Sequence, residues 1–287
     1  MKFSKISIII GTQKGGTSSL FNYLSQHPQV SNSKMKETDF FLKDAKWCKG
    51  IDYYENLYAW DLNKHLTALE ASPNYTRSLN NVRKVIQRMK TVDIRYKFIY
   101  ILRDPVQKIE SMRKQGIYQG WYAKQLARET PDSLPLNVIE SVSYAAIVDA
   151  FTRNFSREQI LLLKTDELKK EVISMTLKHK ICPFLAIEPS FEFSLGKIHN
   201  SKNSYRTDTI WHYLREARYL NPIKNIFPDS IKNNARHVLA KPLMNQDQGK
   251  VPPLTDAQKD FIRATLKDDS HRLETEYSLD ISNWDLN

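Results

Sequence analysis

A short glycine-rich stretch near the start of the chain carries the residues best suited to chemistry. Residues 11–18, GTQKGGTS, hold three glycines, one lysine and three hydroxyl side chains, and they directly follow the apolar run at residues 6–10. A loop that leaves a strand and begins a helix presents free backbone N–H groups at the positive end of the helix dipole, where phosphate-like anions bind. We therefore predict a phosphate-binding loop at residues 11–18.

Each residue type in this loop has a use at an anion. Gly15 and Gly16 let the backbone approach a ligand closely because they carry no side chain. Thr17 and Ser18 add hydroxyl donors in the first helical turn, and Lys14 adds a full charge on a flexible stem. These five residues form the predicted anion-binding group.

The lysine of this loop is placed differently from that of the nucleoside-triphosphate P-loop. Gly11 and Gly16 match the G-x-x-x-x-G spacing, but Thr17 stands where that motif requires lysine, and the lysine lies at position 14. In the triphosphate motif the lysine reaches the β- and γ-phosphates and the next hydroxyl holds Mg²⁺. A P-loop-like loop with an early lysine favours a single terminal phosphate group, as in a mononucleotide or related 5′-phosphate ligand.

Hydrophobic patterning predicts the elements that position the loop. Apolar runs typical of buried parallel strands end at Ile10, Glu70, Arg103 and Lys164. The spacing of one helix face recurs twice between them, at Leu20, Tyr23, Leu24 and His27, and at Val82, Val85, Ile86 and Met89. This alternation predicts an α/β fold with a central parallel sheet and helices on both faces. Because no stretch resembles a linker, residues 1–287 are expected to form a single domain.

Two later segments are also interpreted from local pattern. Thr255 and Gln258 have the spacing of a capping box, which predicts a structural helix after them. Residues 116–135 lack clear periodicity and are rich in Gln, Tyr and Trp, so we expect irregular structure or short helices near a substrate opening.

Composition limits the partners and the compartment. The formal charge of +11 favours anionic partners, but the basic residues are dispersed and form no recognisable nucleic-acid module. Cys48 and Cys182 are too few for a disulfide framework and have no zinc-site spacing, so a reducing, cytoplasmic location is expected. No segment approaches the ~20 apolar residues of a membrane span. No clustered carboxylates or histidines ask for a metal.

The loop and a second segment together resemble a known family. K-G-G-T-S-S-L, beginning at Lys14, resembles the 5′-phosphosulfate loop of sulfotransferases that depend on 3′-phosphoadenosine 5′-phosphosulfate (PAPS), especially the heparan-sulfate-type and related bacterial enzymes. YKFIYILRDPVQKIESM resembles their 3′-phosphate motif, with Arg103 at the end of a strand and Ser111 in the next helix. Independently, Arg103 is expected at the carboxyl end of a parallel strand, where open α/β sheets bind ligands. Asp104 and Pro105 are a natural N-cap and first residue for the following helix.

The resemblance continues to the end of the chain. KIHNSKNSYR resembles the late nucleotide-capping loop of the family, and Lys202 occupies its lysine position, whereas Asn203 departs from the usual glycine or basic residue. His199 and Arg206 are weaker assignments in the same loop. RLETEYSLDISNWDL is similar to the family's C-terminal segment, so the resemblance spans nearly the whole chain.

Sulfuryl transfer requires a cation at the leaving oxygen and a base for the acceptor. The resemblance implies Lys14 as the cation and Glu37, in MKETDFF, as the base, with Asp39 replacing a frequent His or Gln. Burial beside Phe40 and Phe41 is expected to raise the pKa of Glu37 into a useful range. Without the resemblance, Glu37 would simply balance nearby surface lysines.

A further carboxylate and the co-substrate also follow from the resemblance. Glu70, in LEASPNY, is expected to line the acceptor pocket or to hold Lys14 in place. Ala71 stands where many glycan-modifying relatives have lysine, which disfavours a heparan-like polymer. The resemblance thus implies a PAPS co-substrate, 3′-phosphoadenosine 5′-phosphate (PAP) as product, no metal, and a hydroxyl or amine acceptor on a small molecule or glycan.

Two alternatives stay open at this point. A P-loop nucleotide kinase-like phosphotransferase is disfavoured by Thr17 and by the lack of a clear Walker-B strand ending in aspartate. A non-catalytic nucleotide- or polyanion-binding protein would need only the charge and one phosphate loop. A base at Glu37 separates the sulfotransferase hypothesis from this second alternative.

Overall fold

Five parallel strands form the central sheet of the chain. The computed structural model describes residues 2–118, 128–195 and 252–286. The strands are β1 (Lys5–Gly11), β2 (Val30–Asn32), β3 (Thr67–Ala71), β4 (Arg95–Leu102) and β5 (Ile160–Lys164), in the spatial order β2-β3-β1-β4-β5. All four pairings are parallel. The four predicted strands are confirmed, and β2 is an unpredicted addition at one edge.

Helices connect the strands and follow them. The longer ones are α1 (Thr17–Leu24), α4 (Leu79–Met89), α5 (Pro105–Tyr118), α8 (Tyr144–Thr152) and α14 (Asp256–Thr275). The shorter ones are α2 (Asp44–Trp47), α3 (Gly50–Glu55), α7 (Leu136–Glu140), α9 (Ile173–Thr176) and α10 (Cys182–Leu185). Single 3₁₀ or π turns are η1 (Pro73–Thr76), η2 (Arg157–Gln159), η3 (Thr165–Leu168) and η4 (Leu177–Ile181).

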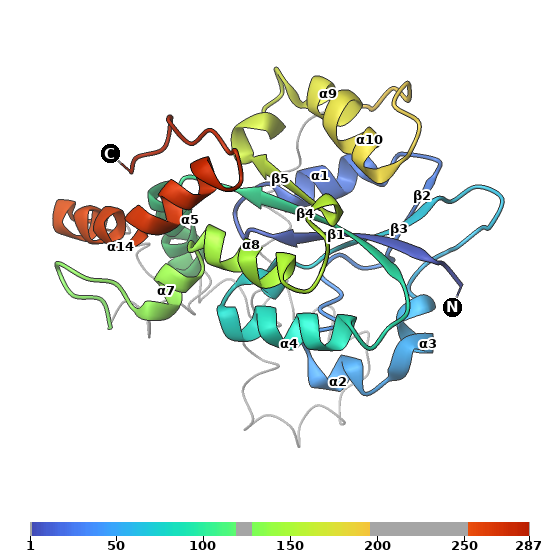
Figure 1. Cartoon of the computed structure of the whole chain (residues 1–287), viewed down its shortest axis with the longest axis horizontal. Helices are drawn as coiled ribbons and strands as arrows, with labels where there is room; N and C mark the ends of the chain where they lie inside the picture. The colour runs from blue at the N-terminus through green and yellow to red at the C-terminus, as the bar shows by residue number, and fades with distance from the viewer. Residues whose placement is uncertain (1, 119–127, 196–251, 287) are drawn as a thin grey trace, which may run out of the picture.

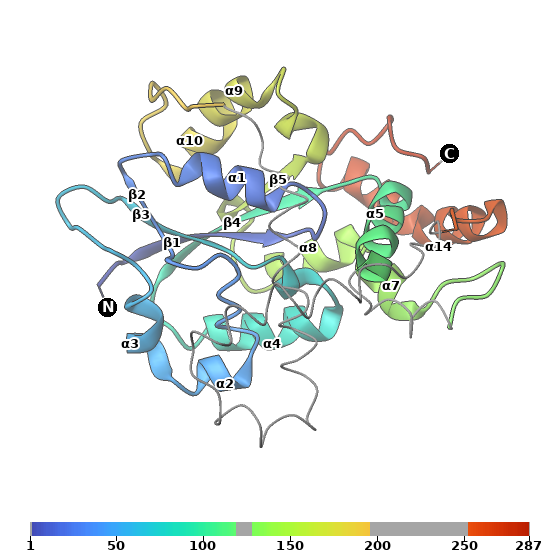
Figure 2. The ribbon, with the colours of Figure 1, turned by 180° about the vertical axis from the view of Figure 1, so that it is seen from behind.

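The sheet is covered on both faces, as predicted. Figures 1 and 2 show α1, α9 and α10 on one face and α4 and α8 on the other. Because side chains alternate across a strand, Ile8 and Ile10 pack into the core beside α4 and α8, whereas Ile9 packs with Leu20 of α1. This two-faced burial explains why the strand reads as a continuous apolar run.

Of the two predicted helix faces, one is confirmed in full and the other only in part. Val82, Val85, Ile86 and Met89 are all buried on α4. In the first pattern α1 ends at Leu24, so His27 is buried outside the helix, where its ring contacts the carbonyl of Glu188. Of the segment expected to hold irregular structure or short helices, residues 116–118 belong to the long helix α5, residues 128–135 are irregular, and residues 119–127 lie outside the described residues.

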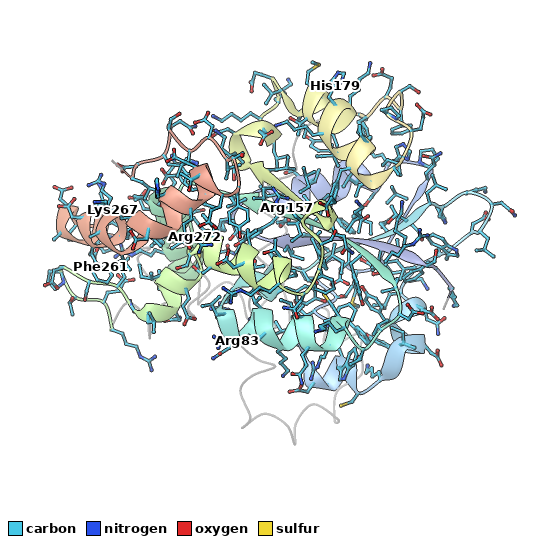
Figure 3. The ribbon with its side chains drawn as sticks, viewed as in Figure 1. Arg83, Arg157, His179, Phe261, Lys267 and Arg272 are labelled. Atoms are coloured by element: carbon cyan, nitrogen blue, oxygen red, sulfur yellow. The ribbon has the colours of Figure 1, made fainter. Side chains whose placement is uncertain are left out.

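The C-terminal helix α14 closes one end of the α8 layer. Thr255 and Gln258 form the predicted capping box at its start. Further along, the Asp269 carboxylate accepts hydrogen bonds from the backbone N–H groups of Ala145 and Ala146, at 3.0 Å each, and so caps α8. Arg272, labelled in Figure 3, forms a 2.7 Å ion pair with Asp149 of α8. None of the described helices is both long and apolar enough to cross a bilayer.

Lys108 of α5 is buried among apolar groups. It is 1% exposed, its ammonium donates to the carbonyl of Ser141 and lies 5.2 Å from the centre of the Tyr144 ring. Desolvation lowers the pKa of this lysine to about 7. The folded protein therefore holds Lys108 uncharged above neutral pH, whereas the unfolded chain keeps it protonated up to its ordinary pKa.

The free energy of unfolding is expected to rise between about pH 7 and pH 10 through this group, with a slope approaching ~1.4 kcal/mol per pH unit. Across that window the unfolded state binds a proton that the folded state lacks, so raising the pH favours folding. Urea unfolding at several pH values measures the effect, and Lys108→Met should remove this part of the slope. Identical pH dependence in the wild type and the variant would contradict the prediction.

Candidate active site

The phosphate-binding loop runs from the last residue of β1 into the first turn of α1. Among the hydrogen bonds of the described residues, none uses the backbone N–H groups of Gly16, Thr17, Ser18 or Ser19. The Gly16 N-cap has a left-handed backbone, with φ 97°, and no side chain caps the helix. The loop therefore offers several unpaired donors at a helix N-terminus, which is the arrangement that binds a phosphate-like anion.

Close packing of the loop explains its glycines. A Cβ atom at Gly15 would lie 3.1 Å from the carbonyl oxygen of Ile101, and one at Gly16 would lie 2.9 Å from Leu168. At Gly11 a Cβ atom would stand 2.1 Å from the hydroxyl of Thr76. The loop is thus pressed against β4, η3 and η1, and side chains at these positions would displace it.

The structure brings Lys14 and Arg103 together. A guanidinium N–H of Arg103, just after β4, donates to the Lys14 carbonyl at 3.0 Å. Burial and, secondarily, the nearby Arg103 charge lower the pKa of the Lys14 ammonium. Among the described side chains, neither Lys14 nor Arg103 forms an ion pair, so the two cations favour an anionic ligand.

The turn after Arg103 is fixed by hydrogen bonds. Asp104 caps α5 by accepting from the N–H of Gln107 at 2.8 Å, and α5 begins at Pro105, as predicted. The backbone carbonyl of Arg103 accepts from the Tyr144 hydroxyl at 2.8 Å. Ser111 lies on α5 and is partly exposed.

Thr165 was missed by sequence reasoning. Its hydroxyl, just after β5, lies 3.0 Å from the carbonyl of Leu102 and 3.3 Å from that of Gly15. It therefore links the end of β4 to the phosphate-binding loop. A lone threonine after a strand carries no signal of this role.

Glu37 belongs to the loop that follows β2 and lies beside the last residue of β3, but its side chain is not buried. Its backbone N–H donates to the carbonyl of Ala71 at 2.9 Å. The expectation of burial beside Phe40 and Phe41 is wrong, because those rings pack into the core while the Glu37 side chain is 44% exposed. Its carboxylate forms a 2.9 Å ion pair with Lys36. An exposed carboxylate is open to an acceptor, and its role as a base stays a prediction.

Glu70 is a fully buried carboxylate at the end of β3. One carboxylate oxygen accepts from the hydroxyls of Ser72 and Tyr75, at 2.6 Å each, and the other accepts from the hydroxyl of Tyr54. Desolvation raises the pKa of Glu70, and these hydrogen bonds oppose the rise. With both oxygens occupied, Glu70 braces the strand end, and no ion pair joins it to Lys14 among the described side chains.

Lys202, with His199 and Arg206, falls outside the described residues. A hollow of about 450 Å³ is lined by residues that include Ser4 and Asp93, which precede β1 and β4. It therefore lies at the amino ends of the strands, and the phosphate-binding loop lies at their carboxyl ends.

In the described part of the chain, no group of three or more His, Cys, Asp or Glu side chains has the arrangement of a metal site.

Comparison with known proteins identifies the class. A family model of the sulfotransferase domain matches residues 5–225. The chain is 25% identical over 214 residues to the bifunctional heparan sulfate N-deacetylase/N-sulfotransferase 4 of Mus musculus, covering 65% of this chain and 23% of that protein. It is 33% identical over 169 residues to the heparan sulfate glucosamine 3-O-sulfotransferase 3B1 of Homo sapiens, covering 56% and 41%. The chain thus matches less than half the length of either relative.

A solved structure shares the fold over almost the whole length. A sulfotransferase from Alicyclobacillus acidocaldarius superposes with a TM-score of 0.61 at 21% identity, covering 97% of each chain.

Proposed function

The chain belongs to the sulfotransferase family, and from this premise we propose that it transfers the sulfuryl group of PAPS to a hydroxyl or amine of an acceptor. The observation that carries the proposal is the phosphate-binding loop, whose free N–H groups lie beside Lys14 and Arg103. Cationic ligands would be repelled here and neutral ones would bind more weakly, whereas an anionic phosphosulfate would gain strong charge-assisted hydrogen bonds.

The residues present fit such a nucleotide. The N–H groups of residues 16–19 and the Thr17 and Ser18 hydroxyls would hold its 5′-phosphate, and Arg103 with Ser111 would hold its 3′-phosphate. The tight packing at Gly15 and Gly16 holds the loop against β4 and η3. Lys202 remains the proposed capping residue.

Lys14 and Glu37 have separate roles in the proposed transfer. PAPS supplies, when bound, a sulfuryl group on a phosphate leaving group. Lys14 provides a cation where negative charge gathers on the departing oxygen. Glu37 takes the proton of the acceptor as the new bond to sulfur forms and the bond to the phosphate oxygen breaks. The Lys36 ammonium pairs with Oε1 of Glu37, so the second carboxylate oxygen can take this proton while the ion pair is kept.

The acceptor is proposed to be a small molecule or a glycan. The relatives above are named for heparan sulfate, whereas Ala71 in this chain is a buried strand residue that brings no charge to the end of β3. Without that charge, a polyanionic polymer would lose a contact near the Glu37 backbone. An acceptor screen with labelled PAPS, covering oligosaccharides and small alcohols or amines, tests this directly.

PAP is expected to bind about ten- to a hundredfold more tightly than AMP, because the 3′-phosphate adds charge-assisted hydrogen bonds worth roughly 1.5 to 3 kcal/mol each. Calorimetry with both nucleotides measures the ratio. Equal affinities of the wild-type protein for PAP and AMP would contradict the proposed function.

Arg103→Ala should reduce this ratio by weakening PAP far more than AMP. Since Arg103 also holds the Lys14 carbonyl, a purely structural role would weaken both nucleotides equally. Ser111→Ala, which leaves the loop contacts intact, should reduce the ratio by a smaller factor.

Transfer is expected to continue in the presence of EDTA, because Lys14 and Arg103 supply the positive charge that a divalent ion supplies in P-loop kinases. The rate of product formation from labelled PAPS, with and without chelator, measures this. Loss of activity that Mg²⁺ restores would instead favour the kinase-like alternative.

A further inference from the structure

The side chain of Asn74 bridges two parts of the site. Asn74 lies in η1, directly after β3. Its carbonyl oxygen accepts from the side-chain amide of Gln13, in the phosphate-binding loop, at 2.7 Å. Its amide nitrogen donates to both carboxylate oxygens of Asp39, at 3.1 and 3.2 Å. A single side chain thus joins residues that lie far apart in the sequence.

The chemistry of the partners determines how Asn74 is oriented. The Asp39 carboxylate, on a residue only 2% exposed, accepts hydrogen bonds, so the NH₂ of Asn74 must face it. That leaves the Asn74 oxygen toward Gln13, where it meets a donor. Lys43 adds a 3.1 Å ion pair to the same carboxylate, so the buried charge of Asp39 is matched.

Asp39 belongs to the Glu37 segment (residues 37–41), whose backbone has an unusual conformation. Glu37 and Asp39 have left-handed φ values of 62° and 48°. This conformation costs non-glycine residues roughly 1–2 kcal/mol each, so it persists only where contacts hold it. The Asp39 N–H donates to the Ser72 hydroxyl at 3.0 Å, and the Lys46 ammonium donates to the Thr38 carbonyl.

The other end of the bridge touches the residue before Lys14. Gln13 is partly exposed, and its one described side-chain hydrogen bond is to Asn74. A ligand bound to the N–H groups of residues 16–19 would restrict the loop, and with it Gln13. Restriction of Gln13 would stabilise Asn74 against Asp39 and so stabilise the left-handed backbone at Glu37.

We propose that Asn74 is a positioning residue that couples occupancy of the phosphate-binding loop to the order of the Glu37 segment. The proposal rests on the proposed function, since it assumes that a nucleotide occupies the loop and that Glu37 acts on the acceptor. Its consequence is that a loaded loop aligns the base, so the acceptor meets an ordered Glu37 only when the sulfuryl donor is present.

Amide hydrogen exchange with PAP as the probe tests the coupling without reference to activity. Three backbone donors report on the segment: Glu37 to the Ala71 carbonyl, Asp39 to Ser72, and Phe41 to the Tyr75 hydroxyl. In the wild type, saturating PAP should slow exchange at residues 37–41 by about fivefold or more. Asn74→Leu, close in shape but unable to hydrogen-bond, should reduce this slowing to less than about twofold.

A second variant keeps the test decisive if Asn74→Leu folds poorly. Gln13→Met breaks only the 2.7 Å link at the partly exposed end of the bridge and leaves the buried Asp39 with its partners. It should abolish the PAP-induced slowing as Asn74→Leu does. The matched control is Asn80→Ala, because Asn80 is an exposed asparagine whose one described side-chain hydrogen bond is with Arg83 of the same helix.

Turnover gives an independent readout. Both variants should lower kcat by roughly tenfold while the KM for PAPS and the affinity for PAP stay within about threefold of the wild type. Their effects on kcat should not add in the double variant, because both break one chain of contacts. A merely structural role predicts additive effects, and observing them would overturn the proposal.

The outcomes separate the two levels of inference. PAP-induced slowing in the wild type that is lost in both variants and kept in Asn80→Ala supports the coupling. Tight PAP binding with the same slowing in Gln13→Met and Asn74→Leu overturns the coupling alone. Failure of the wild type to bind PAP overturns the proposed function and the coupling with it.

Discussion

Glu37→Gln is expected to lower turnover by about 10² to 10⁴ while the affinity for PAP barely changes. The substitution keeps the shape of the side chain and removes only its ability to take a proton. The Glu37 N–H bond to Ala71 involves the backbone, so the left-handed turn should survive. Steady-state kinetics on the true acceptor, with PAP calorimetry in parallel, measure both quantities.

Two controls isolate the base from its surroundings. Lys36→Met removes the ion-pair partner of Glu37 but leaves the carboxylate, so turnover should persist. Glu70→Gln disturbs the hydrogen bonds from Tyr54, Ser72 and Tyr75, so it should lower the melting temperature more than the chemical rate. Near-normal turnover in Glu37→Gln, with a large loss in Glu70→Gln at intact stability, would transfer the role of base to Glu70.

Lys14→Ala is expected to lower turnover by roughly 10² to 10³ and to weaken PAP binding by about tenfold. Unlike Glu37, the Lys14 ammonium would contact the anion both before and during transfer. The measurement compares kcat and the dissociation constant of PAP in the same preparation. Lys14→Met serves as the matched variant, because it keeps the stem of the side chain and removes only the charge.

The titration of the Lys14 ammonium should be visible in the pH dependence of turnover. Burial and the Arg103 charge lower the pKa of Lys14, so the required cation is lost at a lower pH than for an ordinary lysine. Activity should therefore fall on the alkaline side, and in Arg103→Ala that limb should move to higher pH because the like charge is gone. Normal PAP affinity and turnover in Lys14→Met would remove Lys14 from the mechanism.

The strands could be predicted from sequence because burial on both faces leaves a strong pattern. Runs such as residues 6–10 are apolar at nearly every position, since α1 covers one side and α4 with α8 the other. The β2 strand was not predicted because Val30–Asn32 has only three residues and pairs with a single neighbour, β3. His27 looked helical because burial, and not helix geometry, produced its spacing.

Features of the candidate site could be predicted from sequence where a single short segment forms them. The glycine-rich turn between β1 and α1 and the Asp104 cap of α5 are local, so neighbouring residue types reveal them. The Gln13, Asn74 and Asp39 contacts join three separate segments, and no local pattern encodes them. The exposure of Glu37 was also hidden, because the left-handed turn sends Phe40 and Phe41 into the core without it.

The strand order has a consequence for how the chain acquires its structure. In the central β1 strand, Ile6 pairs with Ala68 on one side and with Tyr96 on the other, so both neighbours come much later in the chain. Such long-range pairing must close large loops before any contact rewards it, which makes folding slow. During synthesis the apolar β1 segment has no strand partner until β3 has left the ribosome, and it lacks its second partner until β4 has followed. It is therefore the segment where a chaperone would protect the nascent chain most, and where premature association between chains would begin.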